Sequence, residues 1–191
     1  MKTEQIPPKA SSVNQQGEAD GFTPPTSFCP RILQGGFTRL EVSSPANKLG
    51  MIHKELVKNI SFPCKLRYLK LTDRQTGQQL QEPKSFVAVD ISKARIMQAL
   101  EDFTELFYFD GRHQLWIQGA KEEQIILDEL GMIYVYPDDF LFRDILMKLG
   151  WPEVKQDSMA DRDYVQVSFM ATADIQEDSL LQSFGLVEWS G

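Results

Sequence analysis

The stretch LRYLKLTDRQTGQQLQ, residues 66–81, decides the fold class because it carries the clearest hairpin signal in the chain. An arm of strand-forming residues, 66–71, leads into the turn sequence DRQTG. Gly77 at the end of this turn can adopt the positive φ that a tight loop requires, and a second arm follows at residues 78–81. We therefore expect a β-hairpin here, and with it antiparallel pairing.

Strand-like and helix-like patterns alternate on both sides of this hairpin. Apolar runs or apolar–polar alternation predict further strands at residues 37–42, 86–91, 106–109, 114–118, 132–136, 164–170 and 186–189, with 86–91 apolar on both faces like a central strand. Residues 106–109 and 114–118 flank Asp110 and Gly111, which predicts a second hairpin. Helical spacing predicts helices within residues 45–60, 92–103, 121–130, 137–149 and 180–184. Hairpins combined with helical connections indicate an α+β domain with three to five helices and a mixed, mostly antiparallel sheet.

The first thirty residues differ in composition from the rest. They contain five prolines among serine, glutamine, asparagine and glycine, and few aliphatic side chains. Such a segment buries too little apolar surface to offset the entropy of ordering it. We therefore expect residues 1–30 to form a disordered tail and residues 31–191 to form a single α+β domain. Phe22 and Phe28 are exceptions within the tail, and both are candidates for docking on a partner.

The overall composition is that of a globular chain, with 191 residues, 42% hydrophobic and 25% charged residues, and a formal net charge of -7. No apolar run approaches the roughly 20 residues that a membrane-spanning helix needs. The N-terminal residues lack the apolar core of a signal peptide. We expect a cytoplasmic protein with no membrane association and no cofactor.

Charge is distributed unevenly along the chain. Residues 48–74 contain seven basic side chains against two acidic ones, whereas residues 153–191 contain eight acidic side chains against two basic ones. Residues 1–152 as a whole are close to neutral, with 18 basic and 19 acidic groups. The net charge therefore conceals a basic and an acidic segment, and we expect the two to meet within one molecule or between two copies.

The basic part of the hairpin is the first candidate binding surface. Its side chains are Lys65, Arg67, Lys70 and Arg74, with Tyr68 among them. A strand places Arg67 on one face with Lys65, and Tyr68 on the other face with Lys70. Basic residues beside an aromatic ring can contact an acidic protein surface, or follow a phosphate backbone and stack a base, so nucleic-acid binding through residues 48–74 stays open. An ordinary solvated hairpin has the same composition.

Four aspartates form the second candidate site. They follow predicted strands or begin predicted helices: Asp90, Asp110, Asp138 and Asp139. Carboxylates gathered at strand ends can bind a divalent metal for phosphoryl chemistry, which keeps a metal-dependent phosphoester hydrolase open as an alternative. Each aspartate also has a structural explanation, because Asp is favoured in tight turns and at helix N-termini.

One spacing among these carboxylates resembles a nuclease pattern. Pro137-Asp138 followed by Glu153-Val154-Lys155 resembles the PD-(D/E)xK pattern of metal-dependent nucleases, in which two acids bind the metal and the lysine steadies the attacking water. In that family the second half lies in an apolar strand. Here it lies between Trp151-Pro152 and a polar stretch, so the surroundings contradict the pattern.

Other catalytic constellations are missing from the sequence. The two cysteines and two histidines are far apart and do not make a structural zinc set, and no nucleophile elbow or nucleotide-binding glycine loop is present. The sequence therefore favours a non-enzymatic interaction module that docks a protein partner, or a second copy of itself, through charge-complementary surfaces. The hydrolase and the nucleic-acid binder remain the alternatives.

Overall fold

The computed structural model describes residues 6–189, with the backbone alone for residues 164–167. This part of the chain contains an eight-stranded antiparallel sheet, a separate two-stranded sheet and five α-helices, which confirms the expected α+β class. Parallel pairing within it is limited to an isolated bridge between Phe28 and Glu153.

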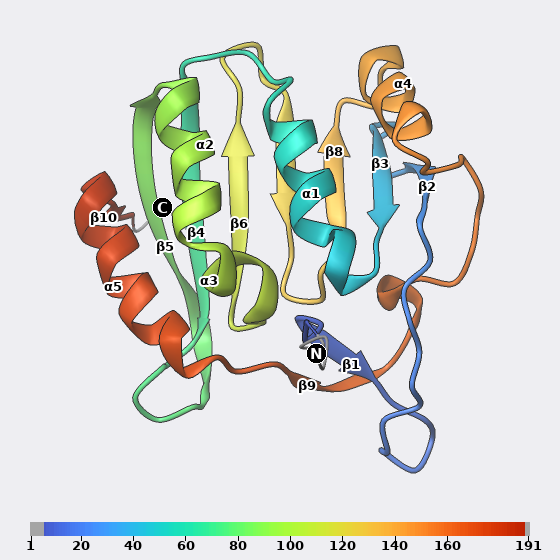
Figure 1. Ribbon diagram of the computed structural model, residues 1–191, viewed down its shortest axis with the longest axis horizontal. Helices are drawn as coiled ribbons and strands as arrows, with labels where there is room; N and C mark the ends of the chain where they lie inside the picture. The colour runs from blue at the N-terminus through green and yellow to red at the C-terminus, as the bar shows by residue number, and fades with distance from the viewer. Residues whose placement is uncertain (1–5, 190–191) are drawn as a thin grey trace, which may run out of the picture.

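The large sheet has the strand order β10-β5-β4-β6-β7-β8-β3-β2 (Figure 1). The expected hairpin forms its β4–β5 pair, and β6, β7 and β8 follow as a meander. The strands are β2 (Ser27–Ile32), β3 (Thr38–Ser43), β4 (Cys64–Thr72), β5 (Gln79–Ile91), β6 (His113–Gln118), β7 (Gln124–Leu127), β8 (Ile133–Tyr136) and β10 (Val187–Glu188).

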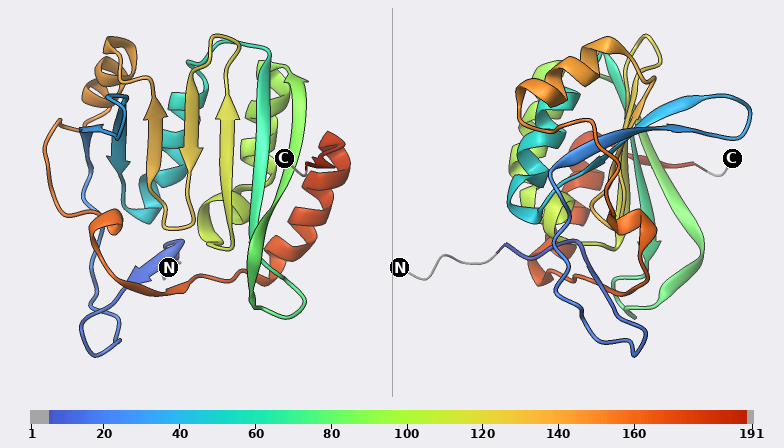
Figure 2. Two further views of the ribbon diagram at one scale, coloured as in Figure 1. Left: turned by 180° about the vertical axis from the view of Figure 1, so that it is seen from behind. Right: turned by 90° about the vertical axis from the view of Figure 1, so that its right-hand side faces the viewer.

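The α-helices lie on one side of this sheet, and in the described part of the chain no α-helix covers the other side (Figure 2). They are α1 (Ala46–Val57), α2 (Lys93–Asp102), α3 (Thr104–Phe109), α4 (Phe140–Lys148) and α5 (Ala171–Phe184), with a short 3₁₀ turn at Met159–Asp161. Two of these helices begin at a capping side chain, since the side chain of Ser92 accepts from the backbone N–H of Arg95 and that of Asp139 accepts from the backbone N–H of Phe142. No helix within residues 6–189 is long and apolar enough to cross a membrane.

The main core fills the space between the helices and the sheet. Leu49, Ile52 and Leu56 form the buried stripe of α1, as their spacing predicts. Gly50 lies in the same helix, at the point where the ring of Tyr108 packs against the helix backbone. A Cβ atom at this position would lie 3.2 Å from the ring of Tyr108 in α3. Glycine therefore sits inside a helix because the neighbouring helix leaves no room for a side chain.

The two-stranded sheet closes one end of the core. β1 (Ala10–Ser12) pairs with β9 (Tyr164–Val167), and the pair runs across the lower end of the large sheet in Figure 1. Lys9, directly before β1, is buried, and its ammonium group donates to the carbonyl oxygen of Phe107 at 2.9 Å. The N-terminal segment is therefore an integral part of the packing.

The expected disordered tail is wrong for residues 6–30. This segment supplies β1 and β2, and Phe28 lies in the main core with 1% of its surface exposed. The entropy lost on ordering this segment is offset in part by hydrogen bonds to a distant part of the chain. The N–H of Phe28 donates to the carbonyl oxygen of Pro152 at 3.1 Å, and the N–H of Val154 donates to that of Phe28 at 2.9 Å. The composition of residues 6–30 cannot reveal these hydrogen-bonding partners, because they lie more than 120 residues away in the sequence. Residues 1–5 lie outside the described residues.

Two short apolar runs have the opposite secondary structure to the predicted one. Residues 106–109, predicted as a hairpin arm, belong to helix α3, and residues 121–130, predicted as a helix, contain strand β7. Periodicity cannot separate a strand from a helix in runs of three or four consecutive apolar residues. Tertiary contacts decide them: β7 pairs with both β6 and β8, and α3 packs against α1 and α5.

The segment 86–91 is also less central than its apolar pattern predicts. It is the second half of β5, which pairs with β4 on one side and, in the described chain, only with the two-residue strand β10 on the other. Val89 is accordingly exposed. A strand with apolar residues on both faces thus lies near the edge of the sheet.

Candidate functional site

Strand β4 separates the predicted basic contact residues onto two faces. Lys65 and Arg67 lie on the side of the sheet that carries no helix. Lys70 shares the helix side with Tyr68, and both bind Glu177 of α5. Arg74, just beyond the strand, is 7% exposed. The expected division of β4 into two faces is therefore confirmed, but the four residues do not form one surface.

Lys70 and Arg74 belong to an internal ion network. The ammonium of Lys70 lies 3.0 Å from a carboxylate oxygen of Glu177, and Arg74 lies 2.9 Å from carboxylates of both Glu177 and Asp174. Burial raises the pKa of Tyr68, whose hydroxyl donates to Glu177. The basic segment and the acidic C-terminal segment thus meet within one molecule, which is one of the two arrangements expected from the sequence; the other was contact between two copies.

Asp110 is enclosed by arginines of the same network. Its carboxylate is fully buried, accepts hydrogen bonds from Nε and Nη2 of Arg112 and lies 3.4 Å from Arg74. Burial raises the pKa of Asp110, but the hydrogen bonds from Arg112 and the charge of Arg74 outweigh it, so that the pKa lies below its ordinary value. Asp110 therefore balances buried positive charge, and its oxygens face protein donors.

The other three predicted metal ligands occupy separate positions. Asp90 is exposed at the end of β5 with a positive φ of 56°. Asp139 caps α4, and Asp138 is held by Arg143 at 2.6 Å. Within residues 6–189, no group of three or more His, Cys, Asp or Glu side chains is arranged to hold a metal ion. The structure does not bring the four aspartates together as a metal site.

The nuclease-like spacing does bring its two acids to one place. Asp138 lies 2.6 Å and Glu153 lies 2.8 Å from the guanidinium of Arg143. The cation between the two carboxylates is thus an arginine of α4, which ties the helix to the connection that follows it. This arrangement is a structural ion triad.

The two phenylalanines predicted to dock on a partner are occupied within the fold. Phe28 is a core residue. Phe22 is half-buried against a small second cluster formed by Ala10, Met132 and Met159, and the guanidinium of Arg162 lies 3.8 Å above its ring. Neither ring presents a free docking surface, because both attach the N-terminal segment to the rest of the chain.

The side of the sheet without helices carries one continuous row of paired residues, which we call the open-face row. Directly paired residues of neighbouring strands share a face. The register joins, in order across all eight strands, Val187, Val87, Arg67, Trp116, Ile126, Tyr134, Glu41 and Cys29. The adjacent row on the helix side is aliphatic and fully buried: Leu66, Ile117, Ile125, Val135 and Leu40.

Toward one end of the open-face row, an arginine–aromatic pair has a carboxylate of its own. The guanidinium of Arg39 lies 4.1 Å from the centre of the Tyr134 ring. Arg39 also lies 2.6 Å from Glu41 and donates to the hydroxyl of Tyr136 at 3.0 Å. Glu41 in turn lies 3.3 Å from Arg31. Positive charge at this end is therefore neutralised within the chain.

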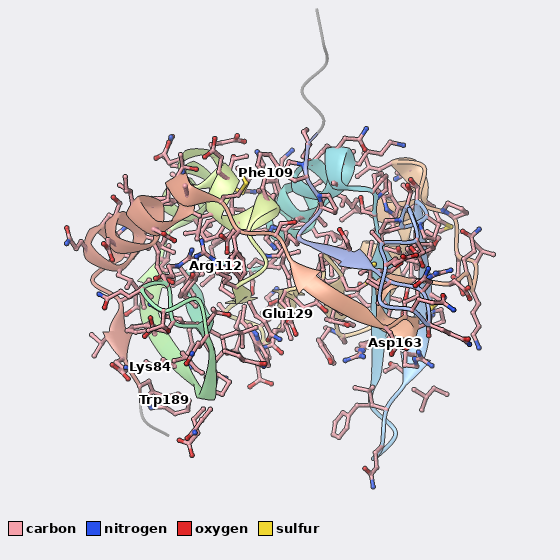
Figure 3. All side chains as sticks on the ribbon, turned by 90° about the horizontal axis from the view of Figure 1, so that it is seen from below. Lys84, Phe109, Arg112, Glu129, Asp163 and Trp189 are labelled. Atoms are coloured by element: carbon pink, nitrogen blue, oxygen red, sulfur yellow. The ribbon has the colours of Figure 1, made fainter. Side chains whose placement is uncertain are left out.

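The opposite end carries a second arginine between two indoles. The guanidinium of Arg67 lies 5.1 Å from the ring of Trp116 and 5.7 Å from that of Trp189. Lys65 lies 5.8 Å from the Trp189 ring. Figure 3 shows Trp189 on the open side of the sheet and Phe109 on the helix side. Two of the predicted contact residues, Lys65 and Arg67, thus lie beside two tryptophans that the sequence reasoning did not assign to any site.

A buried group of titratable residues lies beneath β1. The ammonium of Lys9 is 3.5 Å from Nε2 of His113, and burial lowers the pKa of Lys9 to about 8. Burial also raises the pKa of Asp128 to about 7 and lowers that of His113 well below its ordinary value. Such pKa values would suit acid–base chemistry, but Lys9 is 1% and His113 0% exposed. Lys9 contacts His113, and Asp128 accepts from the backbone N–H groups of Leu130 and Met132 and from the hydroxyl of Tyr134, so all three are occupied within the protein.

Three hollows in the surface lie apart from the aspartates. One of about 650 Å³ lies between α1 and the α2–α3 pair, and another of about 710 Å³ lies beside the N-terminal segment. A third, of about 360 Å³, lies between β2 and the connection 153–161. None of the four predicted metal ligands lines any of these three hollows.

The open-face row was missed although the sequence contains a signal for it. In HQLWIQ and IYVY the aromatic residues Trp116 and Tyr134 alternate with aliphatic residues, which places them on the face opposite the core. The pairing that joins them to Arg67 is a long-range property of the sheet. No protein-family model, curated protein or solved structure matches this chain.

Proposed function

We propose that this chain is a cytoplasmic, non-enzymatic binding module that docks a protein partner on the open face of its large sheet. The observation that carries the proposal is the open-face row, in which Arg67 pairs with Trp116, Ile126 separates Trp116 from Tyr134, and no α-helix of the described chain lies on this side of the sheet. Trp, Tyr and Arg are the residues most enriched at the energetic centres of protein interfaces.

The charge on this face favours a protein over a nucleic acid. Arg31 and Arg39 are both paired with Glu41. Among the basic side chains that the strands place on this face, Lys65 and Arg67 are then the two with no carboxylate partner among the described residues. Nucleic-acid binding rests on many simultaneous phosphate contacts, commonly about 6–10. Two cations on a chain with a net charge of -7 favour a partner with few negative groups.

The edges of the sheet are poorly suited to adding a partner strand. In β2, the N–H of Phe28 points away from β3, so Pro30, two residues further, faces the same outer edge without an N–H to donate. Pro83 lies at an irregularity in the β4–β5 pairing near the other edge. Prolines at exposed edges oppose strand addition. This favours docking on the face.

The non-enzymatic part of the proposal is supported by where the perturbed groups lie. Lys9, Asp128 and His113 are buried, and Asp110 is enclosed by arginines. A catalytic group must reach its substrate.

The test is a selection of peptides from a displayed random library, followed by mapping of the enriched peptides on the isotope-labelled protein by NMR. We expect the indole resonances of Trp116 and Trp189 to shift. Trp116→Ala should weaken binding by at least about tenfold, the loss expected of an aromatic at an interface centre. Met51→Ala, which removes an exposed apolar side chain on the helix side, should leave binding unchanged.

Circular dichroism verifies that both variants are folded, and the mapping on the unmodified protein does not depend on either of them. The proposal is wrong if no peptide is enriched above background, or if the enriched peptides shift resonances on the helix side alone. Displacement of the peptides by a single-stranded oligonucleotide at low micromolar concentration would instead indicate a nucleic-acid binder.

A further inference from the structure

The open face contains two arginines stacked on aromatic rings, and the two differ in one respect. Arg39 lies on Tyr134 and is held by the carboxylate of Glu41 at 2.6 Å. Arg67 lies beside Trp116 and Trp189, and no carboxylate of the described residues lies within 4.0 Å of it. Arg39 is thus paired with a carboxylate of the chain, whereas Arg67 has none among the described residues.

The position of Arg67 is fixed from several sides. Its Nε donates to the hydroxyl of Ser85 at 2.8 Å, and the carbonyl of the same serine accepts from the N–H of Trp189 at 2.8 Å. The indole N–H of Trp116 donates to Gln114 at 2.9 Å, which orients the second ring. A guanidinium held in this way loses little conformational entropy when it binds a ligand.

We infer that Arg67, flanked by Trp116 and Trp189, binds the carboxylate of an acidic side chain in a protein partner. This inference rests on the proposed function and names the chemistry of the ligand. A guanidinium can pair with a carboxylate through two parallel hydrogen bonds, and the indoles reduce access of water to that pair. Lys65, 5.8 Å from the Trp189 ring, adds a second positive charge on the same side.

The flanking rings also define the neighbours of the acidic residue. Indole faces provide apolar contact area, and Trp189 is 55% exposed. The preferred ligand is therefore an acidic residue next to aromatic or aliphatic ones. A strongly acidic segment without apolar residues would leave both indoles in water.

The probe is a short peptide with capped termini that carries two glutamates between two phenylalanines, compared with the same peptide carrying glutamines. Capping removes the terminal charges. Binding is followed through the three tryptophan indole resonances. Trp151 is 1% exposed and its indole N–H donates to the carbonyl of Ser43, so its resonance is an internal reference. We expect Trp116 and Trp189 to shift, and the glutamate peptide to bind roughly tenfold more tightly than the glutamine peptide.

Arg67→Gln should remove this preference, so that the two peptides bind with similar affinity. Arg95→Gln is the matched control, because Arg95 also lies over an aromatic ring, Phe184 at 4.6 Å, but on the helix side. It should retain the full preference. Both variants keep the fold if the Trp151 resonance stays in place.

The outcomes separate this inference from the proposed function. If both peptides shift the two indoles equally in the unmodified protein, the carboxylate site is wrong and docking on the open face stands. If neither peptide shifts them while displayed peptides do bind there, the inference again fails alone. Tighter binding of a phosphoserine peptide or of an oligonucleotide than of the glutamate peptide would also overturn it.

Discussion

The hydroxyl of Tyr68 donates a 2.7 Å hydrogen bond to the carboxylate of Glu177, 109 residues further along the chain. The same carboxylate lies 3.0 Å from Lys70 and 2.9 Å from Arg74. One buried side chain of α5 thus satisfies three polar groups of the β4–β5 hairpin. This relationship attaches the acidic segment to the basic one.

Replacing Glu177 by alanine should reduce the free energy of unfolding by about 3 kcal/mol, because it leaves Arg74 buried without one of its anions and Tyr68 without its acceptor. Urea denaturation of the two proteins measures the difference. Asp178→Ala removes an exposed carboxylate from the next position in the same helix and should change the stability by less than about 0.5 kcal/mol. Equal effects of the two substitutions would contradict the role of the network.

Asp128 should make stability fall as the pH rises from about 4 to about 7. Burial raises its folded pKa to about 7, above the ordinary value of 3.8, so the folded chain binds more protons than the unfolded chain in this range. The stabilisation is fully present below the unfolded pKa and is lost as the pH passes the folded pKa. Asp128→Asn should lose this dependence and be more stable than the unmodified protein near pH 8 by about 2–4 kcal/mol.

Unfolding free energies measured between pH 4 and pH 8 check this expectation. Asp157→Asn, at an exposed carboxylate, is the control and should follow the unmodified protein at every pH. A difference between Asp128→Asn and the unmodified protein that stays constant with pH would show that Asp128 is not the titrating group.

Lys9 should have the opposite effect at higher pH. Burial lowers its folded pKa to about 8, below the ordinary value of 10.5, so the unfolded chain binds more protons between these values and stability rises with pH. Lys9→Met removes that rise. The free energy of unfolding of the variant relative to the unmodified protein should therefore fall by about 3 kcal/mol between pH 8 and pH 10.5. Taking the difference between the proteins cancels the titration of the tyrosines, and Lys155→Met, at an exposed position, should show no such trend.

Gly50→Ala should destabilise the protein although alanine is the better helix former. The new methyl group would lie 3.2 Å from the ring of Tyr108, which is 1% exposed and cannot move away freely. Overpacking of this kind costs about 1–3 kcal/mol, more than the roughly 1 kcal/mol that helix propensity returns. Thermal melting should therefore show a lower midpoint. Asn47→Ala, at an exposed position of the same helix, should raise it slightly, and a rise for both variants would contradict the packing argument.

The sequence predicts the local features of this fold well. The β4–β5 hairpin, the buried stripe of α1 and the start of α4 at Asp139 depend on residues close together in the chain, and all are present. The two faces of β4 also follow from alternation alone.

What the sequence could not predict depends on pairing across long separations. The burial of Arg74 follows from an acid 100 residues away, and the order of residues 6–30 follows from strand β9 and from Pro152. The open-face row follows from the register of seven strand pairs. The sequence of a single strand shows only which of its residues alternate between the two faces, and not which residues of other strands lie beside them. Of the six predicted contact residues, Lys65 and Arg67 share the open face, and the other four make contacts within the fold. That Lys65 and Arg67 bind a partner stays a prediction.

The ion network between β4 and α5 also has a consequence for biosynthesis. Arg74 and Lys70 leave the ribosome about 100 residues ahead of Asp174 and Glu177. At roughly 5–20 residues per second, the hairpin remains without its acidic partners for about 5–20 s. During this interval Tyr68 and its basic neighbours are open to water and to other cellular proteins, and helix α5 covers them only after strands β2–β8 of the large sheet have been synthesised.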